Sequence, residues 1–157
     1  MDGPADARAI AELEVRAWRW AYVDVVAEED MITVEDRIAR WRTQPVDGAF
    51  VAEVEGRVVG VVQVGPDDDP ARRPPSAGRI HGLNVEPAAQ GAGVGTALYE
   101  HACAQLRAAG YAEAVVWVFA ANGHARGFYE RRGWAADGAT RDAAEAPELR
   151  YRQNLAA

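Results

Sequence analysis

Three glycines at alternate positions, Gly91, Gly93 and Gly95, stand where a strand pattern gives way to a helix pattern. Glycine costs an α-helix roughly 1 kcal/mol per residue relative to alanine, so three of them at a helix start require a reason. The N–H groups at the start of a helix carry a partial positive charge, about half an elementary charge in sum. Because glycine has no β-carbon, a bulky anion can approach those groups closely. The segment therefore predicts a phosphate-binding loop between a strand and a helix.

Two other phosphate-binding loops compete with this segment. A Walker loop needs a lysine near the end of its glycine pattern to reach the β- and γ-phosphates, but the chain has no lysine and its 17 basic residues are all arginine. A dinucleotide-binding loop needs the spacing G-x-G-x-x-G, whereas the glycines here are spaced G-x-G-x-G and follow two hairpin strands. The Walker loop is excluded, and the dinucleotide-binding loop fits poorly.

The segments around the glycines predict a βαβα unit. Residues 79–85 are expected to form a strand, and a helix follows the glycines and stops at Gly110. Residues 112–120 are nearly all apolar, which is typical of a central strand buried on both faces. Asn122 can cap a further helix that ends at Gly133.

The remaining segments predict two helices, a hairpin and a terminal strand. Residues 6–26 and 33–42 carry apolar side chains at helical spacing. Residues 49–64 alternate between apolar and polar and turn once at a Glu-Gly pair, which is typical of two antiparallel strands. Residues 148–155 also alternate, and a polar, poorly patterned stretch at 137–147 leads to them.

Composition places the chain among single globular domains. Its 157 residues, 49% of them hydrophobic, can bury a core, so residues 1–157 are predicted to form one domain. Its one cysteine, Cys103, cannot form an internal disulfide, and no N-terminal apolar run has the length of a signal peptide or a membrane span. Both observations favour a cytoplasmic location. The formal charge of −7 disfavours binding to nucleic acid or to an anionic membrane, and we expect no metal site.

Two motifs resemble the signatures of the GNAT family of N-acyltransferases. The stretch Gln90-Gly91-Ala92-Gly93-Val94-Gly95 resembles the family's Q-x-x-G-x-G acyl-CoA motif, and "LNVEP" before it resembles the strand that enters this motif. Downstream, "WVFAANGHARGFYERRGW" is similar to the second signature, in which an asparagine after a strand precedes alanine, Phe-Tyr and a glycine-aromatic turn. The resemblance is strong over residues 79–134 and looser elsewhere.

The resemblance implies an α/β fold with a mixed, α+β-like sheet. In such a GNAT-like fold, antiparallel N-terminal strands precede the βαβα unit, whose two parallel strands splay apart, and a C-terminal hairpin completes the sheet. The family's usual first strand has no predicted counterpart, because a helix is predicted to begin almost at Met1, so either the sheet lacks this edge strand or the N-terminus is trimmed.

Acetyl-CoA is the acyl donor that the resemblance implies. The N–H groups from Gly91 to Thr96 would bind its pyrophosphate without a cationic side chain, and its peptide-like pantetheine arm would pair with the backbone of Leu83–Val85. The acyl group would then lie at the carboxyl ends of the two parallel strands. The predicted cofactor-binding residues are Leu83, Asn84, Val85, Gln90, Gly91, Ala92, Gly93, Val94, Gly95, Thr96, Asn122 and Phe128.

Catalysis requires two proton transfers. An amine with a pKa near 10 is mostly protonated at pH 7 and must lose a proton before it attacks a thioester, whereas the departing thiolate gains from a proton donor. Tyr129 occupies the family position of the general acid. The strand before the glycines lacks the acidic base of many family members, so His81 is our preferred base and Glu86 the second candidate.

Each of these residues has a structural alternative. The glycines could make only a tight turn, Asn122 could serve only as a helix cap, and the Tyr129 ring could belong to the core. His81 could equally be a structural side chain.

The resemblance places the acceptor cleft against the N-terminal helices. Trp18 and Tyr22, together with Trp117, are therefore predicted to bind the acceptor, and further candidates for the cleft wall are Trp20 and Trp41. With the acidic residues 28–30 nearby, an aromatic wall would suit an amine-bearing organic cation through cation–π contact. Core packing is the alternative for these rings.

These observations predict an acetyl-CoA-dependent N-acetyltransferase. It would transfer an acetyl group to a primary amine of a small molecule or peptide by direct attack in a ternary complex. The alternative is an acyl-CoA-binding sensor without turnover, which would use the same glycine loop. A homodimer is common among proteins that resemble this one, so it is one assembly that the resemblance implies.

Overall fold

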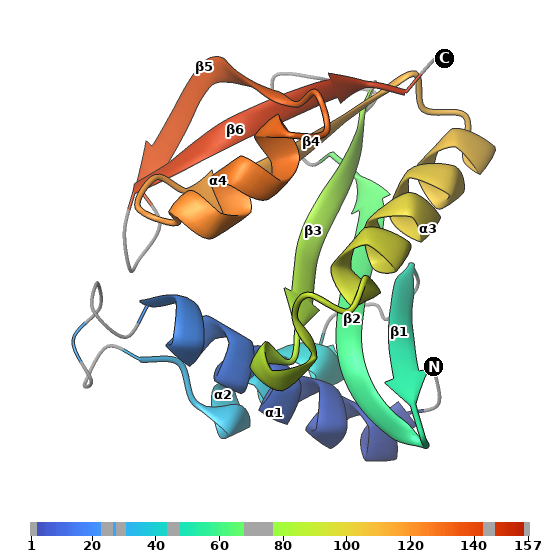
Figure 1. Ribbon diagram of the computed structural model, residues 1–157, viewed down its shortest axis with the longest axis vertical. Coiled ribbons are helices and arrows are strands. Elements are labelled where there is room, and N and C mark those ends of the chain that lie inside the picture. Colours follow the sequence, from blue (N-terminus) through green and yellow to red (C-terminus); the bar gives the residue numbers. More distant parts are fainter. Residues whose placement is uncertain are drawn as a thin grey trace. The chain divides into compact units, whose positions relative to one another are not determined.

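The computed structural model describes residues 3–22, 27, 31–43, 48–67, 77–142 and 147–155. Side chains are described for the same residues, except for residues 3–6 and 42–43. The elements follow the chain in the order α1, α2, β1, β2, β3, η2, α3, β4, α4, β5 and β6 (Figure 1). The strands are hydrogen-bonded in the order β1-β2-β3-β4-β6-β5, so the sheet is mixed.

The chain divides into two compact units, and it passes between them several times. Unit 1 comprises residues 1–63 and 82–102, and unit 2 comprises residues 64–81 and 103–157. Three elements, β2, β3 and α3, therefore contribute residues to both units. The prediction of a single domain stays a prediction.

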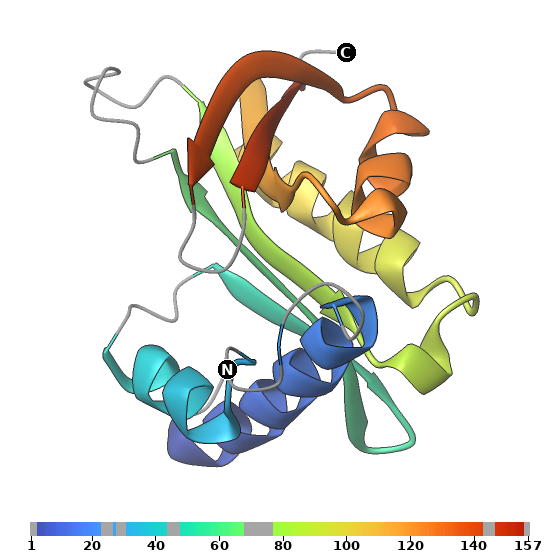
Figure 2. The same cartoon turned by 90° about the vertical axis from the view of Figure 1, so that its left-hand side faces the viewer.

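Unit 1 begins with two helices that pack on a hairpin. Helix α1 spans Gly3–Tyr22 and α2 spans Val34–Thr43, and the two lie side by side in Figure 2. Strand β1 (Ala49–Val54) pairs antiparallel with β2 (Arg57–Pro66). The core between helices and hairpin contains the buried side chains of Ala7, Ile10, Leu13, Trp41, Ala49 and Val61.

A buried carboxylate joins the two helices of unit 1. Glu14 of α1 is 4% exposed and accepts hydrogen bonds from the Arg37 guanidinium and from Trp41 Nε1, both on α2. Burying a charge is unfavourable unless it is paired and hydrogen-bonded, and both conditions are met here. Thr33 caps helix α2, because the N–H of Asp36 donates to Thr33 Oγ1 at 3.2 Å.

The other face of the β1–β2 hairpin receives the first half of α3 (Val94–Ala108). A β-carbon at Gly60 would lie 2.6 Å from Leu98 Cδ1 and 3.0 Å from Val94 Cγ1, so only glycine lets α3 approach this closely. The ring of Phe50 contacts His101 edge-on at 4.4 Å between centroids. Unit 1 is thus a three-layer arrangement of helices, strands and helix.

Unit 2 is built on three antiparallel strands and α4. Strand β4 (Glu113–Phe119) pairs with β6 (Pro147–Asn154), which also pairs with β5 (Ala135–Asp142). Helix α4 (Gly123–Glu130) covers one face of this sheet (Figure 1). On that face the Tyr151 hydroxyl donates to Glu130 Oε1 at 2.7 Å and accepts from Arg126 Nε at 3.0 Å.

Strand β3 (Gly78–Val85) and β4 are the parallel pair that the βαβα pattern predicts. Their register covers only three residue pairs, from Gly78 opposite Ala114 to Ile80 opposite Val116. Both strands continue beyond this register toward their carboxyl ends, which agrees with the expected splayed pair.

Most predicted elements agree with the structure within a few residues. The first helix ends at Tyr22, whereas the prediction extended to residue 26 and so into a segment outside the described residues. The helix after Asn122 ends at Glu130, with Gly133 (φ 88°) in the turn that follows.

The sequence pattern shows no strand at Ala135–Asp142, yet the structure forms β5 there and completes the C-terminal hairpin. Nearly all of β5 is exposed, and its register with β6 shifts between Ala136 and Thr140. Apolar and polar residues do not alternate because neither face of this edge strand is buried.

Candidate active site

The glycine segment of unit 1 forms an open loop before α3. The N–H of Glu86, just after β3, donates to Val59 O at 2.8 Å, and a short 3₁₀ turn, η2 (Pro87–Ala89), follows. Helix α3 starts at Val94, and its first turn closes with the bond from Ala97 N–H to Gly93 O at 3.0 Å.

The glycine N–H groups of this loop are the donors of interest. Among the loop and turn hydrogen bonds of the described residues, none is donated by the N–H group of Gly91, Gly93 or Gly95. Gly91 (φ 85°) and Gly93 (φ 84°) adopt the left-handed conformation that favours glycine, and no atom lies within 4 Å of a β-carbon built on either. The glycines of the loop thus leave the approach to a helix N-terminus open, as an anion requires.

The end of β3 supplies the second part of the predicted donor site. Leu83, Asn84 and Val85 are half-buried and lie beyond the register that β3 shares with β4. An unpaired strand edge can accept an extended, peptide-like chain as an additional strand. This is the property that the expected pairing with pantetheine needs.

Glu86, the second candidate for the base, is engaged in an ion pair. Its Oε2 accepts from Arg16 of α1, with Nε at 2.8 Å and Nη2 at 2.6 Å, and its side chain is 16% exposed. The bidentate pair ties α1 to the segment that leads into the glycine loop. A carboxylate held in this way favours a structural role for Glu86.

His81, the preferred base, lies on the part of β3 that belongs to unit 2 and is half-buried. A β-carbon at Gly65 of β2 would lie 3.2 Å from His81 Nε2. The absence of a side chain at Gly65 therefore leaves room for the imidazole ring.

The second motif forms α4 and an aromatic cluster in unit 2. Asn122 caps the helix, because its Oδ1 accepts from the Ala125 N–H at 3.0 Å. Tyr129 is 5% exposed, and its ring contacts Phe128 at 5.2 Å and Trp134 at 5.3 Å between centroids. The guanidinium of Arg132 lies 3.7 Å from the centre of the Phe128 ring.

Gly127 lies inside α4, where a neighbouring side chain occupies the space that a β-carbon would need. A β-carbon there would lie 3.0 Å from Arg131 Nη1. Elsewhere, Cys103 is buried and His124 is exposed.

The aromatic residues predicted to line the acceptor cleft are mostly packed. Tyr22 is 6% exposed and its ring lies 4.9 Å from that of Trp18. Trp41 is 6% exposed and bonded to Glu14, which makes it a core residue, whereas Trp20 is 50% exposed. The acidic residues 28–30 of the cation hypothesis lie outside the described residues.

Trp117, the third predicted acceptor residue, lies on the face of β4 opposite α4. Its register partner on β6 is Arg150, whose Cζ lies 5.7 Å from the ring centroid. Arg141 of β5 lies closer, with its Cζ 4.3 Å from the same centroid. The indole ring is therefore already in contact with two cations.

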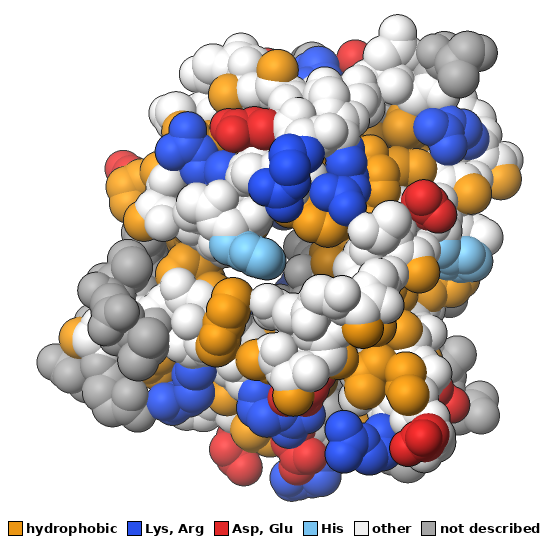
Figure 3. Space-filling view, in the orientation of Figure 1, with side chains coloured by type: hydrophobic (Ala, Val, Ile, Leu, Met, Phe, Trp, Pro, Cys, Tyr) orange, Lys and Arg blue, Asp and Glu red, His pale blue; other side chains and the backbone are white. Residues whose placement is uncertain are grey.

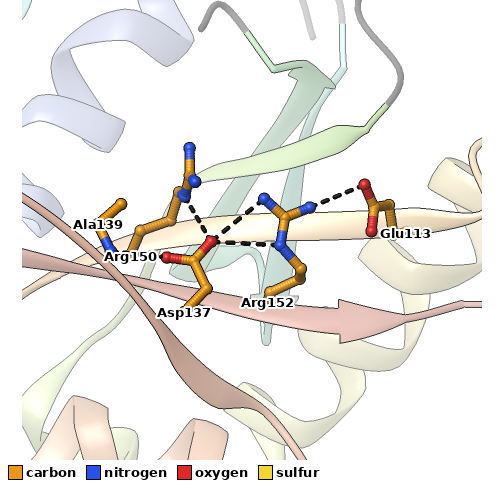
Figure 4. Close-up of polar contacts among 5 residues, drawn as sticks. All are labelled: Glu113, Asp137, Ala139, Arg150 and Arg152. Carbon is orange, nitrogen blue, oxygen red and sulfur yellow. Dashed lines mark hydrogen bonds and ion pairs between the residues drawn. The ribbon is translucent and has the colours of Figure 1, made fainter. Parts of the chain in front are cut away.

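A network of charges fixes the arginines of this face (Figure 4). Asp137 Oδ2 accepts from Arg150 Nε at 2.7 Å and from Arg152 Nε at 3.2 Å, and Arg152 Nη1 lies 2.7 Å from Glu113 Oε1. Burial alone would raise the pKa of the Asp137 carboxyl. The hydrogen bond from the Ala139 N–H and the two guanidiniums outweigh burial and hold this pKa below its usual range.

Asp137→Asn is expected to lower the free energy of unfolding by about 1 kcal/mol at pH 7, because two guanidiniums lose their anionic partner. Since the pKa of Asp137 is depressed in the folded state, its contribution is complete above its unfolded pKa of about 3.9 and is lost as pH falls through the folded pKa. In urea unfolding at several pH values, the difference between wild type and variant should shrink below about pH 4. A difference that is unchanged down to pH 2 would contradict this assignment.

Sequence reasoning missed Arg141, Glu148 and Arg150. The alternation in residues 148–154 places Glu148, Arg150 and Arg152 on one face of a strand, and this signal could have identified a charged surface. Arg141 carries no such signal, because it lies in the unpatterned stretch. The network also borders an open depression of about 570 Å³, lined by Ala112, Glu113, Ala135, Ala136, Asp137, Arg152, Gln153 and Asn154.

Arginine and carboxylate side chains both occur across the face shown in Figure 3. In the part of the chain that is described, no three His, Cys, Asp or Glu side chains are grouped as a metal site would require. None of the described helices is both long and apolar enough to span a membrane.

A mixed α/β sheet with a parallel pair and a glycine loop that opens a helix defines the chain as an acyltransferase-like protein. The sequence profile of the acetyltransferase (GNAT) family matches residues 8–134, and the chain belongs to this family. The family uses acetyl-CoA, and the open glycine loop fits its pyrophosphate. A search of curated protein sequences finds no significant match.

Solved structures of the same fold share low sequence identity with the chain. A ribosomal-protein-alanine N-acetyltransferase from Brucella melitensis is 20% identical with a TM-score of 0.72, over 98% of this chain and 96% of that one. The paia N-acetyltransferase of Thermoplasma acidophilum, in complex with coenzyme A, is 16% identical with a TM-score of 0.70, over 96% and 93%. The yncA protein of Salmonella typhimurium, with its cofactor acetyl-CoA, is 18% identical with a TM-score of 0.69, over 98% and 91%.

Proposed function

We propose that the protein transfers an acetyl group from acetyl-CoA to a primary amine of a small molecule or peptide, by direct attack in a ternary complex. The observation that carries this proposal is the open glycine loop at the start of α3. The N–H groups of Gly91, Gly93 and Gly95 donate in none of the loop hydrogen bonds of the described residues, and no atom lies within 4 Å of a β-carbon position at Gly91 or Gly93. Solved structures of the same fold support it: two are N-acetyltransferases, and two contain coenzyme A or acetyl-CoA.

In this proposal, the residues that bind acetyl-CoA come from the segment between β3 and α4. The loop from Gln90 to Thr96 binds the pyrophosphate, and the backbone of Leu83–Val85 pairs with the pantetheine arm. Asn122 and Phe128 complete the donor site. The acceptor side of the site is assigned to Trp18, to Tyr22 and to the face of β4 that carries Trp117.

Proton transfer is assigned to two side chains of unit 2. His81 takes a proton from the acceptor ammonium and so frees the nitrogen lone pair for attack on the thioester carbon. As the C–N bond forms and the C–S bond breaks, Tyr129 gives a proton to the departing sulfur. The nitrogen loses two protons in all. One leaves through His81 to solvent, and the other replaces the proton that Tyr129 gave to the sulfur.

A second function, an acyl-CoA sensor without turnover, is favoured by one observation. The Tyr129 side chain is 5% exposed and its ring contacts Phe128 and Trp134, which is also the environment of a core residue. A tyrosine that serves only in packing would leave the donor site without its general acid.

Two measurements on the full chain test these functions. Calorimetry with acetyl-CoA measures binding, and release of free thiol in the presence of each amine of a panel measures transfer. The proposed function predicts saturable binding and amine-dependent thiol release. Binding without thiol release for any amine would support the sensor instead, and absence of binding would contradict both. The homodimer and the cytoplasmic location remain predictions.

A further inference from the structure

The indole ring of Trp117 is not available to an acceptor cation. Arg141 lies against its face, 4.3 Å from Cζ to ring centroid, and Arg150 lies 5.7 Å away. A third cation at this ring would be repelled by two guanidiniums. The group that this surface can offer to an acceptor is therefore a guanidinium rather than an aromatic face.

Arg141 is held in one orientation by two contacts. Its Nε donates to Glu148 Oε1 at 2.8 Å, and its Cζ lies over the Trp117 ring. Glu148 is 9% exposed, so the anchor is a buried carboxylate. An arginine that is already ordered loses little side-chain entropy when it binds a ligand.

The two Nη atoms of the Arg141 guanidinium are available as donors. The Arg141 side chain is 42% exposed, and neither of its Nη atoms has an acceptor among the described residues. Arg150 differs, because its side chain is 13% exposed and bonded to Asp137. Two parallel N–H donors on one planar group match the two oxygens of a carboxylate.

Arg141 also lies near the end of β4 at which the proposed reaction takes place. Its anchor Glu148 is the register partner of Phe119, the last residue of β4. Ligands of open α/β sheets bind outside the carboxyl ends of the parallel strands, and β4 is one of the parallel pair.

We propose that Arg141 binds a carboxylate of the acceptor, so that the preferred acceptors are primary amines that also carry a carboxylate. This inference rests on the proposed acetyl transfer. It replaces a cationic acceptor at Trp117 with an amino acid-like one. Glu148 and Trp117 act as positioning residues, because they orient the guanidinium and do not themselves touch the acceptor.

Three acceptors of equal chain length test the proposal: 4-aminobutyrate, 4-aminobutanamide and 1,4-diaminobutane. They present a carboxylate, a neutral amide and an ammonium at the same distance from the reacting amine. We expect kcat/KM of the wild type to be about 10- to 100-fold higher for the carboxylate than for the amide, and lowest for the diamine.

Arg141→Gln should remove this preference by raising KM for 4-aminobutyrate about 10- to 100-fold, with KM for 4-aminobutanamide and for acetyl-CoA unchanged. Arg141→Lys keeps the charge but loses the two-pronged geometry, so part of the preference should remain. Arg8→Gln is the matched control, because Arg8 is an exposed arginine paired with Glu12 on α1. Melting temperatures of all variants establish that they fold.

The outcomes separate the two proposals. Wild-type turnover of the diamine or amide that equals turnover of the carboxylate would overturn the role of Arg141 and leave acetyl transfer standing. An unchanged preference in Arg141→Gln would overturn it as well. Thiol release with no amine of the panel would instead contradict the proposed function.

Discussion

Tyr129→Phe is expected to lower kcat by about 10²- to 10⁴-fold while the Kd for acetyl-CoA stays the same. The departing thiolate gains from a proton donor, and a tyrosine hydroxyl with a pKa of about 10 is fully protonated at pH 7. Phenylalanine keeps the ring contacts with Phe128 and Trp134. Steady-state thiol release and calorimetry on the same preparation measure the two quantities.

The matched control is Tyr151→Phe. The Tyr151 hydroxyl also lies on a buried ring, but it bonds Glu130 and Arg126, so its loss should reduce stability without a comparable effect on kcat. If Tyr129→Phe turns over as fast as the wild type, Tyr129 is a core residue and another group protonates the sulfur. Equal losses of kcat in both variants would indicate a structural effect.

Gly93→Val is expected to raise the Kd for acetyl-CoA about 100-fold or more. Gly93 has a φ of 84° and open space where a β-carbon would stand, so valine would fill the space through which a pyrophosphate reaches the N–H groups. Loss of two hydrogen bonds to a charged group is sufficient for an effect of this size. Isothermal titration calorimetry measures the change.

Gly138→Val separates this effect from backbone strain. Gly138 of β5 has a φ of 90° and likewise has no atom within 4 Å of a built β-carbon. A left-handed conformation costs a non-glycine residue about 1–2 kcal/mol, so both variants should lose similar thermal stability. Only Gly93→Val should lose affinity. Equal Kd values for the two variants would remove the glycine loop from the donor site and with it the main support for the proposed function.

Local signals explain why several elements were predictable. The Glu-Gly turn of the first hairpin has both residues at positive φ, 53° and 76°, as the alternating flanks require. Asn122 caps α4 through its side-chain oxygen, as its position before the helix indicates. These features depend on neighbours within a few residues, so the sequence expresses them directly.

The role of Glu86 shows where local reasoning fails. A carboxylate just past a strand that enters the glycine motif is a reasonable base candidate, but Arg16, 70 positions earlier in the chain, forms a bidentate contact with it. No pattern within either segment reveals this pair. Packing of α1 against the segment after β3 brings the two residues together.

The sequence by itself determined the glycine loop, the strand before it and the helix after it, because turn chemistry and hydrophobic periodicity act over a few residues. The tertiary structure alone decided what surrounds Trp117. Arg141 reaches that ring from a strand without a pattern, through a register that shifts between Ala136 and Thr140, and Glu148 anchors it from the next strand. Such contacts follow from the pairing of distant segments, and no short stretch of sequence encodes them.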